Sequence, residues 1–393
     1  MLELLWLLLP VAAASGWWVA RREYAGRRDR ATAHNTEYFK GLNYLIEDKP
    51  DQAIEVFTRM AGVDRSTAEI HLTLGNLFRR RGEVDRAIHL HASLIARPTL
   101  TVDQRRRAMF ELGEDYLRAG LFDRAEALFR ELLEQPQSDY TEVALSRLIH
   151  IFQQEKDWRQ AIAHCDRLER IGGASRRRET AHFCCELAEE ASQRRQDEET
   201  KAWLLDALTR DPGCVRANLL LGHLAMRTGD YRAAIAALQA VARQDQGYFP
   251  EVIAPLDQCY KALDQLHEWG AYLREIQQWD HGGRITDALA NWLVRQEGEE
   301  ETLQFLEREL QDYPTLLGLR RLVEIQLARG DAGGRYANLR ALHCISTQML
   351  DGAARYRCVN CGFIVKTLHW CCPSCQQWST IKPMSDLVMK TSA

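Results

Sequence analysis

The sequence lacks the loop motifs of the common enzyme classes. Its 393 residues contain no G-x-x-x-x-G-K-[ST] loop, no G-x-S-x-G elbow and no G-x-G-x-x-G fingerprint, which excludes the usual phosphate-binding and acyl-transfer machinery. His267 and Glu268 begin like a zinc-protease helix, but Ala271 stands where that motif requires a second histidine. We therefore expect a protein that is not an enzyme.

The chain also lacks a strong charge of either sign. Its formal net charge is -4, so it has no overall basic surface of the kind that displaces counterions, and nucleic acid is not an expected partner. Six of the 11 cysteines fall between Cys344 and Cys375, and the others are scattered. An odd and clustered set indicates a reducing compartment with a local metal site, not a secreted disulfide framework.

Charged side chains are missing from a run near the N-terminus. Within residues 4–20 the only polar side chain is that of Ser15, and with the residues before it the run is just long enough to span a bilayer. A buried core helix and a cleaved signal peptide are the alternatives, but a signal peptide carries positive charge before its apolar run, whereas here Glu3 precedes it. Five arginines follow the run, at Arg21, Arg22, Arg27, Arg28 and Arg30. We predict a transmembrane anchor over residues 1–20, a basic juxtamembrane linker over residues 21–34 and a cytoplasmic location for the bulk of the chain.

A helical-repeat pattern fills most of the remaining chain. The stretch around Gly75 has one apolar helical face, a break at Gly82 and a second apolar helix, and the stretch around Gly113 repeats this order. Equivalent first-helix positions recur every 33 to 39 residues, at Gly41, Gly75, Gly113, Ile149, Ala188, Gly222, Asp257 and Ala290. This spacing is typical of the tetratricopeptide (TPR) repeat, whose period is about 34 residues.

The small residues at most of these positions have a packing reason. Two antiparallel helices cross there, and a side chain larger than a methyl group would hold their backbones apart. The hairpins at Ile149 and Asp257 should therefore be looser. We predict an all-α superhelical solenoid over residues 35–345, with about nine hairpins, of which the last, around residues 316–343, is degenerate. Stacked hairpins expose an inner surface that is suited to binding partner proteins.

Two other features of the solenoid have both a structural and a functional interpretation. Basic runs occur at residues 79–81, 105–107 and 176–178. They could dock acidic partners, but we favour solvated helix ends and turns. The cluster of His182, Cys184 and Cys185 could bind a metal, but it lies in a predicted hairpin helix where core cysteines are ordinary.

Four cysteines near the C-terminus form two C-x-x-C pairs: Cys358, Cys361, Cys372 and Cys375. Each pair turns tightly enough to point two thiolates at one ion, and the segment between the pairs is long enough for a short hairpin. Four cysteine ligands leave no open position for water, so the site is structural, or redox-active with iron, but not hydrolytic. We predict a four-cysteine metal-binding domain over residues 355–381 and a tail over residues 382–393.

The sequence determines the identity of the bound ion less well than the identity of its ligands. Four thiolates suit both zinc and iron, and the Cys-Gly and Cys-Pro pairs resemble rubredoxin knuckles, although the segment between them is shorter. We expect Cys371 to be spare, because adjacent residues rarely point at the same ion. So small a domain needs support, and we expect it to pack on the final hairpins through apolar residues such as Phe363, Trp370 and Trp378.

Over nearly its whole length the sequence resembles the lipopolysaccharide assembly protein B (LapB) family of Gram-negative bacteria. The resemblance rests on residues 1–5 with 7–14, on residues 71–78 with 81–88, and on residues 356–383. It implies a TPR solenoid with a small rubredoxin-like or zinc-ribbon module, and it implies metal ligands at Cys358, Cys361, Cys372 and Cys375. Cys371 is a departure, since a residue such as histidine is expected there.

The resemblance also implies a function. LapB-like proteins limit lipopolysaccharide synthesis at the inner membrane by promoting degradation of the deacetylase LpxC through the membrane protease FtsH. Expected partners are therefore an FtsH-type protease, LpxC, other lipopolysaccharide-assembly proteins and inner-membrane lipid. Two alternatives stay open: a scaffold for lipopolysaccharide-synthesis proteins with no role in proteolysis, and a rubredoxin-like electron carrier.

Overall fold

The structure is a computed structural model in which the chain divides into two compact units. The described residues are 17–18, 37, 39–44, 46–47, 49–63, 68–98, 100–135, 139–279, 283–329, 336–352 and 355–384. Unit 1 comprises Met1–Asp157 with Asp166–Gly173, and unit 2 comprises Trp158–Cys165 with Ala174–Ala393. Each unit is described by itself.

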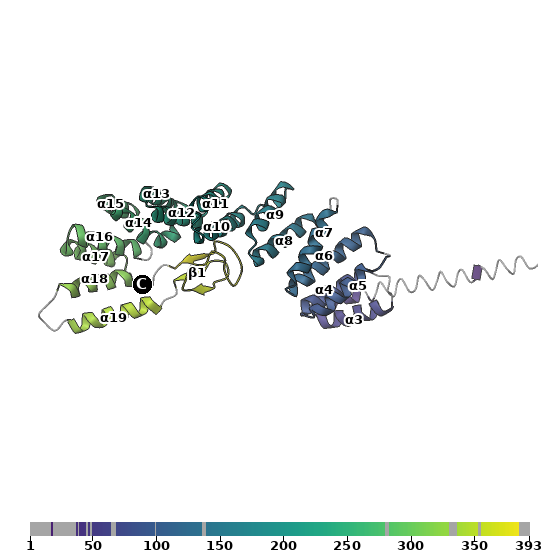
Figure 1. Ribbon diagram of the computed structural model, residues 1–393. Helices are drawn as coiled ribbons and strands as arrows, with labels where there is room; N and C mark the ends of the chain where they lie inside the picture. Colours follow the sequence, from purple (N-terminus) through teal and green to yellow (C-terminus); the bar gives the residue numbers. More distant parts are fainter. Residues whose placement is uncertain are drawn as a thin grey trace, which may run out of the picture. The chain divides into compact units, whose positions relative to one another are not determined.

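Both units are built from antiparallel helical hairpins, which confirms the predicted TPR solenoid (Figure 1). Unit 1 contains α3 (Pro50–Val63), α4 (Ala68–Arg81), α5 (Val84–Ile95), α6 (Val102–Arg118), α7 (Phe122–Glu134) and α8 (Thr141–Glu155), and α9 (Trp158–Arg170) is shared between the units. Unit 2 contains α10 (Arg177–Gln193), α11 (Asp197–Arg210), α12 (Val215–Thr228), α13 (Tyr231–Gln244), the 3-10 helix η1 (Gln246–Glu251), α14 (Ile253–Ala262), α15 (Leu266–Ile276), the 3-10 helix η2 (Gln277–Trp279), α16 (Arg284–Gln296), α17 (Glu299–Asp312), α18 (Leu316–Ala328) and α19 (Tyr336–Gly352).

The predicted membrane anchor over residues 1–20 and the linker over residues 21–34 lie outside the described residues, apart from Trp17 and Trp18, which are exposed. In the part of the chain that the structure describes, no helix has the length and apolar character needed to cross a membrane. Most of the predicted tail, from residue 385 onward, is also outside the described residues.

Close helix crossings occur where the sequence places glycine. A Cβ atom on Gly41 would stand 2.6 Å from the ring of Phe57, and one on Gly113 would stand 2.7 Å from the ring of Phe129. In unit 2, a Cβ atom on Gly222 would stand 2.6 Å from a methyl carbon of Leu238. Each of these hairpins therefore closes by seating an apolar side chain of its second helix against a glycine of its first.

The hairpin formed by α14 and α15 departs from this pattern. The backbones of these two helices approach each other at far fewer positions than those of α12 and α13, as expected where Asp257 replaces a small residue. The close approach falls instead on Gly270 of α15, where an added Cβ atom would meet the indole of Trp292 on α16 at 2.3 Å. In this part of unit 2, the glycine therefore allows close packing between neighbouring hairpins and not within one hairpin.

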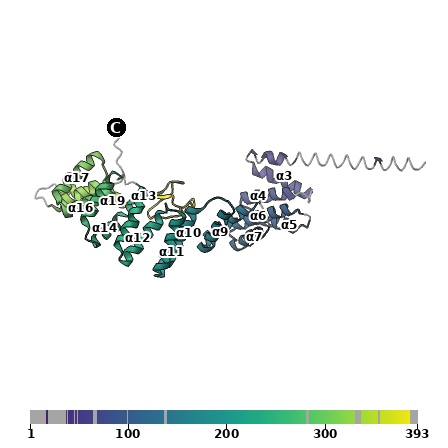
Figure 2. The same ribbon diagram turned by 90° about the horizontal axis from the view of Figure 1, so that it is seen from above.

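The described C-terminal residues form a small antiparallel sheet. Its strands are β1 (Tyr356–Cys358), β2 (Ile364–Val365) and β3 (Ile381–Pro383), in the order β2-β1-β3. The register pairs Arg357 with Ile364 on one side and with Lys382 on the other. Figures 1 and 2 both show the sheet beside α10 in unit 2, so a segment late in the sequence lies on helices from its middle.

Candidate metal centre and its seat on the repeats

The two C-x-x-C pairs adopt the same local turn. In each, an amide four residues after the first cysteine donates to the carbonyl of that cysteine: Gly362 N to Cys358 O at 2.9 Å, and Gln376 N to Cys372 O at 2.8 Å. The donating residue has positive φ in both turns, 78° at Gly362 and 55° at Gln376. This left-handed conformation suits glycine in the first turn, whereas Gln376 adopts it at some cost.

The turns bring the four predicted ligands into one cluster. The Sγ atoms of Cys358, Cys361, Cys372 and Cys375 all lie within 4.8 Å of one another. The pair Cys358 and Cys375 and the pair Cys361 and Cys372 each have an Sγ–Sγ distance of 3.7 Å. Four sulfurs bound tetrahedrally at about 2.3 Å from one ion lie about 3.8 Å apart, whereas a disulfide requires about 2.05 Å. The geometry therefore fits one metal ion in a four-cysteine site.

The surroundings of Cys358 favour its thiolate. Burial opposes ionisation, but hydrogen bonds with Thr380 and with the amides of Asn360 and Cys361 outweigh it and lower the pKa of Cys358 to about 6. The Sγ atom of Cys358 lies 3.3 Å from the Thr380 hydroxyl. A thiolate is the form that binds a metal, so these groups prepare the site for an ion.

Cys371 is not part of the cluster of four sulfurs. It is partly buried and bridges to Trp378 through its backbone, so its side chain belongs to a different part of the module. Burial raises the pKa of Cys371 to about 11, and so favours its neutral thiol.

The metal-binding module packs on helices of unit 2 through Trp378, and we call this contact the seat of the module. The indole of Trp378 stacks on the ring of His182 with centroids 4.9 Å apart. It also meets Trp158 and Phe183 edge-on, at 6.4 and 5.8 Å. Since these partners lie on α9 and α10, one tryptophan fastens the module to two helices of the solenoid.

A second set of contacts joins the module to η1. Tyr248 stacks on Trp370 at 5.4 Å and donates its hydroxyl proton to the carbonyl of Ile381 at 2.8 Å. From the module, Tyr356 donates to a carboxylate oxygen of Glu251 at 2.8 Å. The ammonium of Lys382 pairs with Asp245 at 2.7 Å. The seat thus combines stacking, hydrogen bonds and an ion pair.

The position of this seat corrects one prediction. We expected the module to pack on the final hairpins through Phe363, Trp370 and Trp378, but the two tryptophans contact α9, α10 and η1, and Phe363 is 38% exposed. The sequence could not place the seat, because the contact joins positions nearly two hundred residues apart.

His182, which the sequence grouped with Cys184 and Cys185 as a possible metal ligand, belongs instead to this seat. It is buried, and its Nε2 shares a hydrogen bond of 2.6 Å with the hydroxyl of Ser379. Burial lowers the pKa of His182 to about 3, and the nearby positive charge of Arg216 contributes to this shift, so the ring is neutral. Its neighbours Cys184 and Cys185 are fully buried core residues, as expected. The signal that the sequence offered for this contact was a histidine within an apolar part of a predicted helix.

Parts of the first two basic runs are less solvated than predicted, whereas Arg177 and Arg178 of the third run are exposed, as expected. Arg79 is only 19% exposed and binds two carboxylates, those of Glu111 at 2.6 Å and Asp115 at 2.8 Å. Asp115 in turn accepts from His91 Nδ1 at 2.5 Å, and both of these side chains are fully buried. Part of the first run is therefore a buried ion-pair network that joins α4, α5 and α6.

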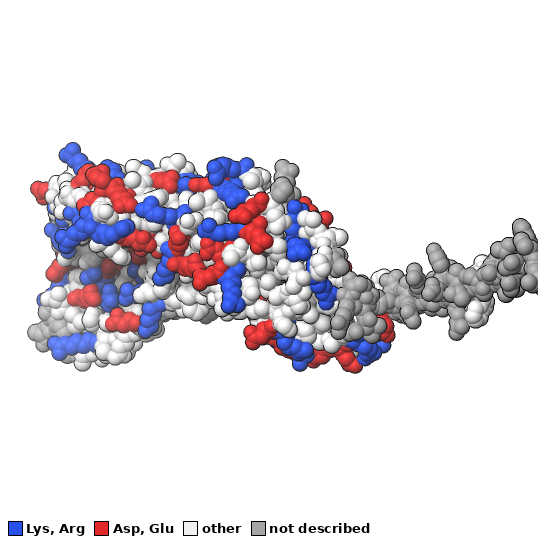
Figure 3. Space-filling view, turned by 45° about the vertical axis from the view of Figure 1, so that its right-hand side comes forward, with Lys and Arg blue, Asp and Glu red and all other residues white. Residues whose placement is uncertain are grey.

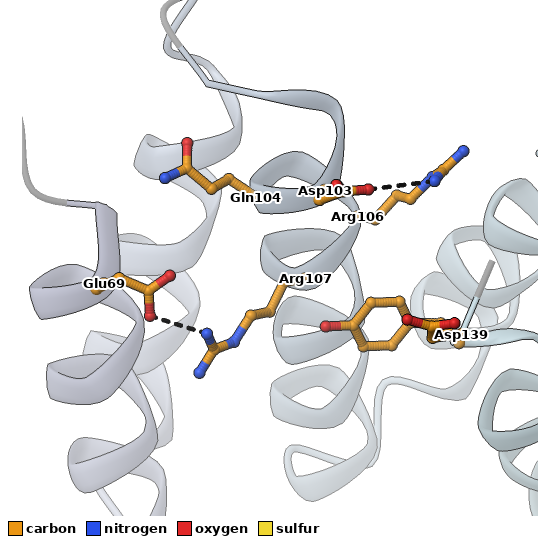
Figure 4. Close-up of a pocket in the computed structure, with 7 residues that line it drawn as sticks. Glu69, Asp103, Gln104, Arg106, Arg107 and Asp139 are labelled. Atoms are coloured by element: carbon orange, nitrogen blue, oxygen red, sulfur yellow. Dashed lines mark hydrogen bonds and ion pairs between the residues drawn. The ribbon is translucent and has the colours of Figure 1, made fainter.

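The second basic run lines a polar pocket of about 430 Å³ in unit 1 (Figure 4). Seven residues from the starts of α4 and α6 and from the segment just before α8 surround it: Glu69, Asp103, Gln104, Arg106, Arg107, Asp139 and Tyr140. Figure 4 shows Arg107 reaching toward Glu69, with which it pairs at 2.8 Å. Charges of both signs face this pocket.

Charge on the face drawn in Figure 3 is mixed. Figure 3 shows Lys and Arg side chains interspersed with Asp and Glu over the visible face, with no single basic region.

Comparison with known proteins supports the division into repeats and metal module. Residues 356–383 match the rubredoxin metal binding domain of the zinc-ribbon type. Residues 40–101, 110–175 and 199–254 match tetratricopeptide repeats. The solved structure of Pseudomonas aeruginosa pilF has a TM-score of 0.32 and 17% identity and covers 58% of this chain and 97% of its own, which is too low to support an argument.

Two relatives match along almost the whole chain. The lipopolysaccharide assembly protein B of Escherichia coli (strain K12) is 37% identical over 388 residues, which cover 98% of this chain and 99% of the relative. The protein of the same name from Haemophilus influenzae is 35% identical over 397 residues, with the same coverage. With the TPR repeats and the four-cysteine module in place, the chain belongs to the lipopolysaccharide assembly protein B family.

Proposed function

We propose that this protein is a non-catalytic adaptor that restrains lipopolysaccharide synthesis by bringing the deacetylase LpxC to an FtsH-type membrane protease. The observation that carries the proposal is the likeness, along 98% of the chain, to proteins named lipopolysaccharide assembly protein B. TPR repeats supply extended surfaces for partner proteins. We propose the polar pocket of unit 1 as one such surface in this chain.

In this proposal the N-terminal run over residues 1–20 anchors the chain in the inner membrane, with the bulk of the chain on the cytoplasmic side. Tethering a client to the membrane raises its effective concentration near a membrane protease. The arginines of residues 21–34 would lie against anionic headgroups and hold this orientation.

We further propose that Cys358, Cys361, Cys372 and Cys375 hold one zinc or iron ion whose role is structural. The bound ion would fix the fold of the module, and thereby the position of the side chains that seat it on α10 and η1. The 3.7 Å Sγ–Sγ distances and the closed set of four thiolates support this role.

The decisive experiment follows LpxC in the host cell. Depleting the protein should lengthen the half-life of LpxC several-fold and raise lipopolysaccharide synthesis, and restoring it should reverse both. An unchanged LpxC half-life would overturn the adaptor proposal. If lipopolysaccharide assembly were still impaired in that case, the scaffold alternative would take its place.

A further inference from the structure

The small sheet has one face toward the repeats and one face toward solvent. Tyr356 and Val365 are paired across β1 and β2 and are partly buried, and the Tyr356 hydroxyl reaches Glu251 on the solenoid. Because side chains alternate along a strand, the next pair, Arg357 and Ile364, lies on the opposite face. Both of these side chains are exposed.

This outward face joins apolar and cationic groups. Exposed fractions are 66% for Val359 and 53% for Ile364, although both lie in a module with few residues to form a core. Lys366 follows two residues after Ile364 and is also exposed. We call Arg357, Val359, Ile364 and Lys366 the outer face of the module.

The charge of the module has one sign. Residues 355–383 contain two arginines and two lysines but no aspartate or glutamate. Lys382 is used in the seat, where it pairs with Asp245. Arg357 and Lys366 form no ion pair with any residue that the structure describes. The outer face therefore presents cations with no carboxylate of the module to balance them.

The edge of the sheet beside these residues is open. β2 is the outermost strand, and within residues 355–384 only β1 pairs with it. An open strand edge offers unpaired backbone groups to an extended segment, and its flanking side chains then select the sequence of that segment.

We propose that the outer face docks a segment of a partner protein that is acidic and carries apolar side chains, lying along the open edge of β2. Carboxylates of the segment would pair with Arg357 and Lys366, and its apolar side chains would cover Val359 and Ile364. This surface is separate from the seat on α10 and η1, and the inference does not depend on the proposed role in proteolysis.

A protein segment fits this face better than a lipid surface. Lipid-binding basic segments carry about four to eight lysines and arginines, whereas the outer face has only Arg357 and Lys366. Two fixed cations beside two apolar side chains are instead the pattern of a specific protein contact, with a buried apolar centre and a charged rim.

Site-specific photo-crosslinking of the full chain in its host cell tests this inference. p-Benzoylphenylalanine replaces Ile364 in one variant and Leu205, which is 49% exposed on α11, in a matched control. After irradiation, mass spectrometry identifies the crosslinked molecule. We expect protein adducts at position 364 on a segment with an excess of Asp and Glu, at several times the yield found at position 205.

Charge reversal then tests the recognition. In the crosslinking variant, Arg357→Glu with Lys366→Glu should lower the adduct yield at least about fivefold, whereas Lys201→Glu with Arg232→Glu, two exposed cations of α11 and α13, should leave it unchanged. Retention of one metal ion per chain shows that the reversed module is folded. Lipid adducts, adducts that are indifferent to charge reversal, or a yield no higher than at position 205 would each overturn the inference.

Discussion

At the scale of single residues, one hairpin of unit 1 is held by polar groups where its neighbours use apolar packing. Phe57 and Phe129 lie against the crossing glycines of their hairpins, but the equivalent position against Gly75 is taken by His91. The imidazole is buried and donates to Asp115, which also binds Arg79. A buried network of this kind is sensitive to the loss of any one partner.

Asp115→Ala should therefore destabilise unit 1 strongly. The substitution leaves Arg79 and His91 in the interior without their shared acceptor, and removing one partner of a buried ion pair costs about 3–5 kcal/mol. Chemical denaturation monitored by circular dichroism measures the change in the free energy of unfolding. Asp103→Ala on the same helix is the control, since Asp103 is 91% exposed and should cost less than about 1 kcal/mol. Equal effects of the two substitutions would contradict a stabilising role for the network.

The neutral state of His182 makes a second residue-level prediction, which concerns pH. Its folded-state pKa of about 3 lies below the value of 6.5 in the unfolded chain. Between these values the unfolded state binds a proton that the folded state does not, so stability falls as pH decreases through this window, by up to about 1.4 kcal/mol per pH unit. His182→Phe should keep the stack on Trp378 and remove this dependence.

The measurement is the difference in unfolding free energy between the native chain and His182→Phe, followed from pH 7 to pH 4.5. Acid weakens thiolate ligation equally in both proteins, so their difference isolates His182. We expect this difference to shift in favour of the variant as the pH falls. A difference that stays constant across the range would show that His182 is not the titrating group.

At the scale of elements, the metal module has a core too small to fold unaided. Its three strands hold two or three residues each, and its fully buried side chains are few. Modules of this size usually need a metal or another structure to support them. Both kinds of support are available to this module, since four cysteines surround one point where a metal ion can bind and the tryptophans pack on the solenoid.

Replacing Cys358 and Cys361 by Ser should therefore unfold the module and spare the repeats. Structural four-cysteine sites draw on the order of 10 kcal/mol from metal binding, which the double variant loses. We expect no bound metal and rapid amide exchange over residues 356–383, while far-ultraviolet circular dichroism keeps almost all its helical signal because repeats depend mainly on their neighbours.

Cys371→Ser is the matched control for this variant. The Cys371 thiol lies outside the cluster of four sulfurs, so this substitution should retain one metal ion per chain. Loss of metal from Cys371→Ser would assign a ligand role to that residue. Normal regulation of lipopolysaccharide by a metal-free double variant would argue against the structural role of the ion.

At the scale of the whole molecule, the proposed function requires that the repeats and the module be held at the membrane. Deleting residues 1–20 should give a chain that folds normally, since each repeat hairpin depends mainly on its neighbours in the stack. We expect the truncated protein to move to the soluble fraction and to leave LpxC several-fold longer-lived when expressed at its native level. Full regulation by the truncated chain would show that the anchor is dispensable.

Much of this molecule is determined by local sequence. The glycines at positions 41, 75, 113 and 222 mark helix crossings because only a missing Cβ atom allows the backbones to approach, and this requirement acts within one hairpin. The two C-x-x-C pairs likewise specify their turns within five residues each. The repeat fold, its period and the grouping of four thiolates could therefore be predicted from the sequence alone.

Only the tertiary structure decided what those parts touch. Trp378 and Trp370 were expected to pack against helices, but which helices receive them depends on where the stacked hairpins place His182 and Tyr248, and no local pattern encodes a contact between residues so far apart. In the same way, the sequence alone suggests that Arg79 is an ordinary surface charge and His91 an ordinary helical histidine, although both belong to a buried network. The sequence determined the hairpins and the cysteine knuckles because their constraints are short-range, and the fold decided the seat of the module because that contact exists only after the repeats have stacked.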